Sequence, residues 1–209
     1  MTKLLIIILP LLLLPIQSFA QSHIVGIRNG LNLTNINSDS FSDSENRMGY
    51  NAGISYEYHS KKKYHIGIDL LYFQRGFDLS GLEYDEFGNP TGEELPSTHF
   101  IYNYLSIPLK VGIAKGDRIG WFGQAGLVPS LLMNSKVVDR YFGTINTRKH
   151  LTKIDVAGLI EVGGIHRLSS DLLIFGSTSF QHSFNSVAES RMKHYSISFS
   201  IGFRKVITR

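Results

Sequence analysis

The feature that most constrains this chain is an alternation of apolar and polar residues with a period of two, which recurs after residue 20. This period places successive side chains on opposite faces of a β-strand, whereas an amphipathic helix needs a period of 3.6 residues. Eight runs carry the pattern, and no stretch between them has helical periodicity. The runs cover residues 25–33, 48–58, 64–75, 101–113, 121–133, 153–162, 172–183 and 195–204. The sequence therefore predicts an all-β fold.

The connections between these runs alternate between short and long. The short ones cover residues 59–63, 115–120 and 166–171, and the long ones cover 35–47, 78–99, 134–150 and 185–193. A run of about ten residues is the length that a tilted strand needs to cross a bilayer. Together these features predict an eight-stranded antiparallel up-and-down transmembrane β-barrel with four long external loops and three short periplasmic turns.

The composition of the two strand faces separates this barrel from a soluble one. A soluble eight-stranded barrel of the lipocalin kind turns its polar faces to water and holds an apolar ligand inside. Here the apolar faces carry no charge, and the opposite faces are dominated by Gly, Ser and Asn with scattered charges. Small residues suit a narrow interior, so the pattern favours polar faces inside and apolar faces toward lipid.

The charges on the polar faces are nearly balanced in sign, although they could also be unrelated surface charges. An isolated charge in a lumen too narrow for bulk water is very costly, so such groups must pair. We therefore predict a structural network of lumen charges. Its expected members are Arg28, Glu57, Asp69, Arg75, Lys110, Lys153, Asp155, Glu161 and Arg204.

The segment "NYLSIPLKVG" tests this assignment, because it places Pro108 and Lys110 within an otherwise apolar strand. Both residues have the parity of the polar face, so we expect Lys110 to pair in the lumen with Asp69 or Asp155. Proline has no N–H, and a closed barrel has no strand edge at which to place it. A missing ladder bond or a bulge is therefore expected at Pro108.

Residues 1–20 have the order of a secretory signal peptide: a positive start, an uncharged run over 4–16, and small residues at the two positions that a signal peptidase reads. Pro10 and Pro15 interrupt a run that is already short for the alternative, a membrane-spanning anchor. We expect a cleaved signal peptide over residues 1–20, followed by one outer-membrane barrel domain over 21–209.

Several segments resemble the outer-membrane β-barrel domain family common in Bacteroidetes, whose members are often labelled PorT-like. They are "VGIRNGLNLTNI", "AGISYEYHSKKKYHIGIDLLYFQRG", "YNYLSIPLKVGI", "GWFGQAGLVPSLLMNSK", "DVAGLIEVGGIHRL" and "YSISFSIGFRK". The resemblance covers residues 24–205, and "YLSIPL" is its most specific part. One departure lies at the end, where six residues follow Phe203, although barrels of this kind often stop at an aromatic residue read by the assembly machinery. The resemblance implies a fold and an outer-membrane location, but no single activity.

Catalytic and cofactor motifs are absent from the sequence, so we expect neither an enzyme nor a cofactor or metal. The segment "SFQHSFNSVAE" resembles the His–Ser signature of outer-membrane lipid A deacylases, in which the serine lies two positions after the histidine. Here that position is Phe184, and Ser183 points to the opposite strand face from His182. A nucleophile needs its base within about 3 Å, so the lipid A-modifying enzyme is the weaker alternative.

The long loops differ in charge. The loop over 78–99 carries six carboxylates and no Lys or Arg, and its "FGNPTG" predicts a protruding hairpin. The third and fourth long loops are basic. These loops could dock together, bind divalent cations and lipopolysaccharide phosphates, or simply be solvated. The expected partners are outer-membrane lipid and lipopolysaccharide, the barrel assembly machinery, and a protein bound through the loops.

A formal net charge of +4, evenly interleaved, does not indicate nucleic acid. The predicted role is structural or interactive, at the cell surface or as an accessory to a secretion complex. The alternative is a narrow solute pore.

Overall fold

The computed structural model describes residues 22–38, 44–60, 63–84, 90–139, 143–148, 151–186 and 192–208. The expected signal peptide at residues 1–20 lies outside them. No helix within the described ranges is long and apolar enough to cross a membrane. The strands are β1 (Ser22–Asn37), β2 (Ser44–His59), β3 (Tyr64–Tyr84), β4 (Pro90–Ser106), β5 (Leu109–Lys115), β6 (Ile119–Asp139), β7 (Gly143–Asn146), β8 (Ile154–Arg167), β9 (Leu172–Ser183) and β10 (Lys193–Thr208).

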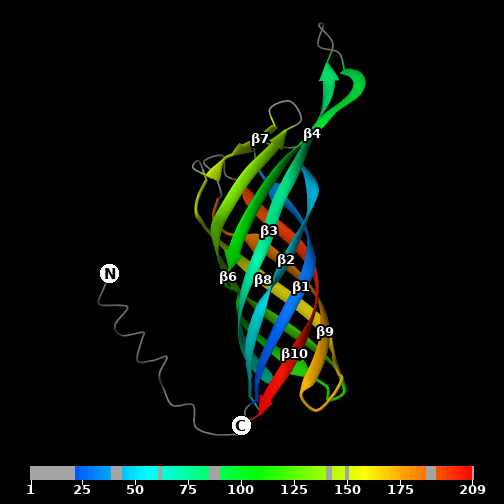
Figure 1. Ribbon diagram of the computed structural model, residues 1–209, viewed down its shortest axis with the longest axis vertical. Helices are drawn as coiled ribbons and strands as arrows, with labels where there is room; N and C mark the ends of the chain where they lie inside the picture. The colour runs from blue at the N-terminus through cyan, green and yellow to red at the C-terminus, as the bar shows by residue number, and fades with distance from the viewer. Residues whose placement is uncertain are drawn as a thin grey trace, which may run out of the picture.

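The strands pair antiparallel in a complete ring (Figure 1). From β1 the pairing passes through β2 and β3 to the consecutive strands β4 and β5, then through β6, β8, β9 and β10 back to β1. Strands β4 and β5 together form one span, and β7 pairs only with β6 in the described part of the chain. The ring therefore has eight spans, which confirms the predicted eight-stranded up-and-down barrel. Both ends of the described barrel, Ser22 and Thr208, lie at the short-turn end, where they pair with each other.

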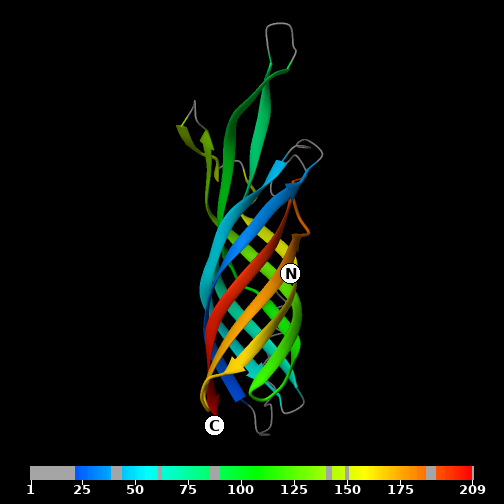
Figure 2. The ribbon, with the colours of Figure 1, turned by 90° about the vertical axis from the view of Figure 1, so that its right-hand side faces the viewer.

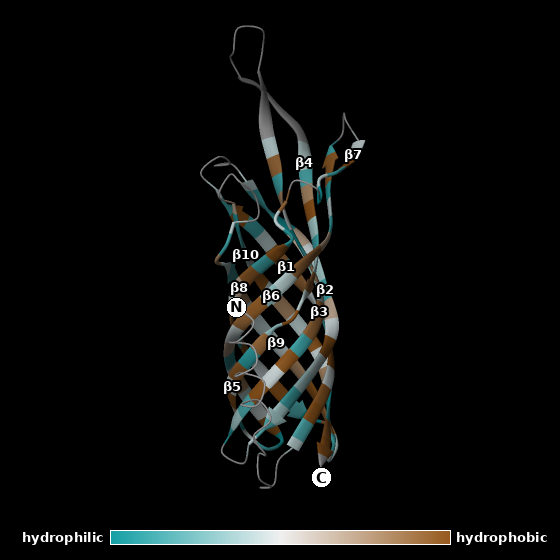
Figure 3. Cartoon of the chain, turned by 90° about the vertical axis from the view of Figure 1, so that its left-hand side faces the viewer, coloured by the Kyte–Doolittle hydropathy of each residue, from teal (hydrophilic) through white to brown (hydrophobic). Residues whose placement is uncertain are grey.

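The apolar face of each span points outward. Ile27, Ile54 and Val111 are 59%, 58% and 61% exposed, whereas their polar neighbours Arg28, Ser55 and Lys110 are buried. Figure 3 shows the resulting mosaic, with hydrophobic and hydrophilic residues alternating along the strands of the wall. Apolar side chains would not be left outside a soluble barrel in this way, so the lipid-facing assignment is confirmed.

Pro108 divides the fourth span into β4 and β5. The pairing with β3 keeps one register across the break, from Leu71↔Ser106 to Ile68↔Leu109. The Asp69 N–H donates to the Pro108 carbonyl at 3.0 Å, and proline has no N–H to return the bond. One hydrogen bond of the ladder is therefore missing at Pro108, as predicted, and the register shows no bulge there.

Two of the long connections contain β-strand residues beyond the eight spans. Strands β3 and β4 continue to the pair Tyr84↔Pro90, and the hairpin that they form rises beyond the barrel (Figure 2). This extension agrees with the hairpin predicted from "FGNPTG", although residues 85–89 lie outside the described ranges. Strand β7 folds back on the end of β6, from Lys136↔Asn146 to Asp139↔Gly143. The eight sequence runs therefore identified the spans but stopped short of the strand ends on the external side.

Candidate functional site

The centre of the lumen holds a four-residue charge cluster built from four spans. Arg28 of β1 lies 3.1 Å from Asp69 of β3 and 2.8 Å from Glu161 of β8. Lys110 of β5 lies 2.7 Å from the same Asp69 and 3.9 Å from Glu161. Each cation thus contacts both carboxylates. Of the two partners expected for Lys110, the structure places Asp69 against it.

A second group of charges lies toward the short-turn end. Arg204 of β10 is 2.8 Å from Glu57 of β2, and the ring of His59 is 2.9 Å from the other oxygen of that carboxylate. The Arg204 guanidinium also stacks on the ring of Phe175 at 4.2 Å and on that of Phe122 at 4.7 Å. These rings replace the water that a charged group would otherwise require.

A bridge from Gln124 links the two groups. The Gln124 amide donates to Glu161 Oε2 at 2.6 Å, and its carbonyl oxygen lies 3.0 Å from the His65 ring. The ring of His65 in turn stacks on that of His59 at 4.7 Å. The polar contacts are therefore continuous from the short-turn end to the central cluster.

A third group lies toward the external loops. Arg75 of β3 forms an ion pair with Asp155 of β8. Gln181 and Ser183 of β9 accept hydrogen bonds from the same guanidinium at 3.2 and 3.3 Å. Ser183 also donates to Asp155 at 2.9 Å, so side chains of β9 hold both members of the pair.

In the described lumen the buried cations and carboxylates are equal in number, so their charges cancel. Four cations and four carboxylates line it, and none is more than 7% exposed. The cost of moving these charges out of water is therefore offset by opposite charges and by hydrogen bonds. The eight residues are Arg28, Arg75, Lys110, Arg204, Glu57, Asp69, Asp155 and Glu161.

Lys153, the ninth expected member, is not part of the network. It is exposed and precedes the first residue of β8, and its carbonyl accepts the Leu132 N–H at 2.8 Å. Lys153 has the same parity as the lumen residue Asp155, but the period-two pattern could not show that the strand begins only at Ile154. Beyond the strand end a long side chain is free to remain in water.

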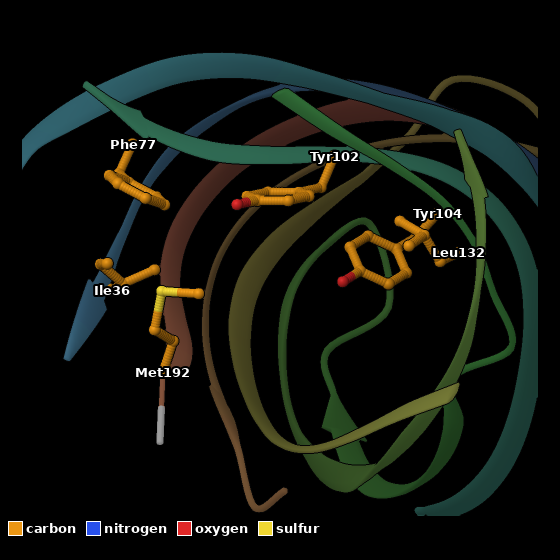
Figure 4. Packing of buried hydrophobic residues seen from close by; sticks show 6 residues of the cluster. All are labelled: Ile36, Phe77, Tyr102, Tyr104, Leu132 and Met192. Atoms are coloured by element: carbon orange, nitrogen blue, oxygen red, sulfur yellow. The ribbon is translucent and has the colours of Figure 1, made fainter. Parts of the chain in front are cut away.

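An apolar cluster closes the lumen on the external side of Arg75. It contains Ile36, Phe77, Tyr102, Tyr104, Leu132 and Met192, none more than 8% exposed. Figure 4 shows Tyr102 and Tyr104 projecting from the wall into the interior. A cavity beside the central charges, lined by Arg28, Phe73 and Glu161 among others, has a volume of about 10 Å³, which is room for about one water molecule.

Sequence reasoning missed this cluster and the uncharged polar residues of the network. Phe73 and Phe77 have the same parity as Arg75 and therefore lie on the lumen face. Their apolar side chains could have indicated that this face becomes apolar toward the loops. Gln124 lies on the expected polar face but carried no charge to single it out. His65 also lies on the polar face of its strand and is buried, but an uncharged imidazole gives no sign in the sequence that it belongs to a network.

The residues considered for a lipid A-modifying activity do not form a catalytic pair. Ser183 is buried in the lumen and bound to Asp155, whereas His182 lies on the opposite face of β9, where it pairs with Gly158 and Tyr195. Among the described residues, no group of three or more His, Cys, Asp or Glu side chains is arranged to hold a metal ion.

Comparisons with known proteins agree with this architecture. A family model described as "Outer membrane protein beta-barrel domain" matches residues 19–203. Neisserial surface protein A superposes with a TM-score of 0.54 at 12% identity, covering 88% of this chain and 96% of the neighbour. The outer membrane protein OprG from Pseudomonas aeruginosa gives a TM-score of 0.50 at 10% identity, covering 91% and 97%. A comparison with curated proteins finds no significant relative. At such identities the two structures support the fold alone.

Proposed function

The chain belongs to the outer membrane protein β-barrel domain family and lies in the outer membrane, and from that premise we propose that it is a closed barrel that acts through its external loops rather than as a pore. Strands provide the membrane anchor, and the loops provide the contact surface. This role requires no chemistry inside the barrel.

The observation that carries the proposal is the filled lumen. Three groups of paired charges are stacked along the interior, and the apolar cluster around Tyr104 closes the end nearest the loops. An eight-stranded barrel leaves an interior that side chains just fill, and here the cavity beside Arg28 and Glu161 has a volume of only about 10 Å³. A solute would have to break buried ion pairs to pass.

The external side supplies an element suited to contact. The β3–β4 hairpin projects beyond the barrel, and its base is fixed by Asp78, which lies 2.7 Å from Arg47 of β2 and 2.9 Å from His99 of β4. Thr98 donates to Asp139 of β6 at 2.7 Å. These links to both flanking spans hold the hairpin base in place, so its distal part is presented away from the membrane.

The partner is proposed from the sequence. The resemblance of "YLSIPL" and the neighbouring segments to PorT-like proteins of Bacteroidetes supports an accessory role in a secretion complex. A surface-contact role with lipopolysaccharide or another protein uses the same loops. No observation on the described residues favours the enzyme reading, because His182 and Ser183 lie on opposite faces.

Planar-bilayer recording on the refolded chain tests the closed lumen. We expect no reproducible open state, because the central cluster and the apolar cluster each close the lumen. A porin fold of known conductance, refolded in parallel, shows that insertion has occurred. Stable steps of porin size from this chain would overturn the proposal and establish the solute pore instead.

A further inference from the structure

The short-turn end of the barrel carries an excess of positive charge that the lumen does not use. Five exposed cations lie there in the described residues: Lys63, Lys115, Arg118, Arg167 and Lys205. Two exposed carboxylates, Asp117 and Asp171, accompany them in the same described ranges. In this family of barrels the short-turn end faces the periplasm, so the excess lies at the level of the inner leaflet's headgroups.

These cations differ from those of the lumen in having no ionic partner among the described residues. In the described part of the chain, none of the five has a carboxylate oxygen within 4.0 Å, whereas every lumen cation has at least one. The chain therefore pairs its charges where water is excluded and leaves the rim charges available. Unpaired cations beside a bilayer attract anionic lipids.

Two of these cations share a hollow of about 490 Å³ between the β5–β6 and β8–β9 turns. Asp117, Arg118, Arg167, Leu168 and Ser169 line it. The two turns are joined by the Arg167 N–H, which donates to the Arg118 carbonyl at 2.8 Å. The hollow is thus built by the fold from two turns that are far apart in sequence.

Local geometry fixes the backbone at Arg118 and the guanidinium of Arg167. Gly116 has a φ of +116°, and a Cβ at this position would approach the Ile119 carbonyl to 2.4 Å, so the turn that presents Arg118 requires glycine. Arg167 donates to the carbonyls of Asp117 at 3.2 Å and Ser170 at 2.7 Å. Its guanidinium is therefore held at the hollow in advance of any ligand.

The surroundings of the hollow are apolar on the side of the membrane. Ile119, Trp121 and Leu168 are 74%, 51% and 51% exposed. A ligand that fits both parts has an anionic head and an apolar tail. We propose that this hollow binds the phosphate headgroup of an anionic glycerophospholipid of the periplasmic leaflet, with Arg118 and Arg167 facing the phosphate and the acyl chains lying beside Trp121.

The single tryptophan of the chain provides the experiment, because Trp121 lies three residues from Arg118 on the lipid-facing wall. The refolded chain is placed in phosphatidylcholine bilayers that contain brominated phosphatidylglycerol or, at the same mole fraction, brominated phosphatidylcholine. Bromine quenches a nearby indole, so the two curves give the relative affinity of the lipids at this position. We expect phosphatidylglycerol to be preferred by about fivefold, the effect of one net cation near the surface.

Matched variants separate the site from overall charge. Arg118→Gln/Arg167→Gln should lose the preference, and Asp117→Asn should increase it, because it removes the carboxylate that lines the hollow. Arg148→Gln/Lys153→Gln removes two exposed cations from the external side and should leave the preference unchanged. Equal loss in both double variants would overturn the proposal and leave a nonspecific charge effect. Relief of the preference by millimolar inorganic phosphate would identify a site for free phosphate and also overturn it.

Discussion

At the scale of single residues, the lumen shows how the chain accommodates charge in a nearly dry interior. Asp69 accepts from both Lys110 and Arg28, at 2.7 and 3.1 Å, and is 1% exposed. Its removal would leave Lys110 with Glu161 at 3.9 Å as its remaining ionic partner. A buried ion pair does not by itself stabilise a fold more than apolar residues of similar volume would. Removing one member, however, leaves the other as an uncompensated buried charge, which is strongly destabilising.

Asp69→Asn should therefore lower the free energy of unfolding by about 3–5 kcal/mol, measured by urea titration of the refolded chain in lipid vesicles. Asp69→Asn/Lys110→Met should recover most of that loss, because Arg28 and Glu161 still form a pair. Asp171→Asn at an exposed turn is the control, with a change within about 0.5 kcal/mol. If the double variant were less stable than Asp69→Asn, the lumen charges would not act as pairs.

At the scale of the element, period-two alternation was sufficient to predict the spans and their faces. It placed Lys110 and Glu161 inside because parity alone decides the face of a strand. It could not place Lys153, because parity does not show where a strand begins. Nor could it predict the apolar cluster, whose Ile36 and Met192 come from strand and loop ends brought together by closure of the barrel. Ile101, which has the parity of the apolar face in the run over 101–113, is likewise buried.

The β4–β5 break gives a prediction at the same scale. Ile107 lies opposite a second proline, since its N–H donates to the Pro129 carbonyl at 2.9 Å. Pro108→Ala supplies an N–H directed at Asp69, so the amide of residue 108 should exchange slowly in hydrogen-exchange measurements. The free energy of unfolding should change by less than about 1 kcal/mol, because the new hydrogen bond is offset by a more flexible unfolded chain.

Pro129→Ala is the matched case, with its new N–H directed at Ile107. Fast exchange at both substituted positions, at the rate of an exposed turn, would show that the two prolines mark a distorted wall rather than two missing bonds. The continuous register on both sides of Pro108 argues for the missing bonds.

At the scale of the whole molecule, the barrel and the external hairpin are separable parts. The eight spans close through contacts that end near Asp78 and Thr98, and beyond that level β3 and β4 pair only with each other in the described residues. The lumen charges, the apolar cluster and the periplasmic rim all lie on the barrel side of this boundary. The fold therefore allows the hairpin to be changed without changing the membrane anchor.

Replacement of residues 80–97 by Asn-Gly tests the proposed role of the hairpin. Leu79 and Thr98 are paired, and a two-residue Asn-Gly turn joins such a pair without strain. The variant should keep the gel mobility shift of a folded barrel on heating and lose less than about 1 kcal/mol in urea unfolding, because Asp78 still binds Arg47. Crosslinks to outer-membrane partners, read by mass spectrometry, should disappear.

A full-length control variant separates the charge of the hairpin from its shape. In it, five carboxylates are changed to the corresponding amides: Glu83, Asp85, Glu86, Glu93 and Glu94. Undiminished crosslinking by the shortened chain would place the contact surface elsewhere, on the β6–β7 side or on the barrel wall.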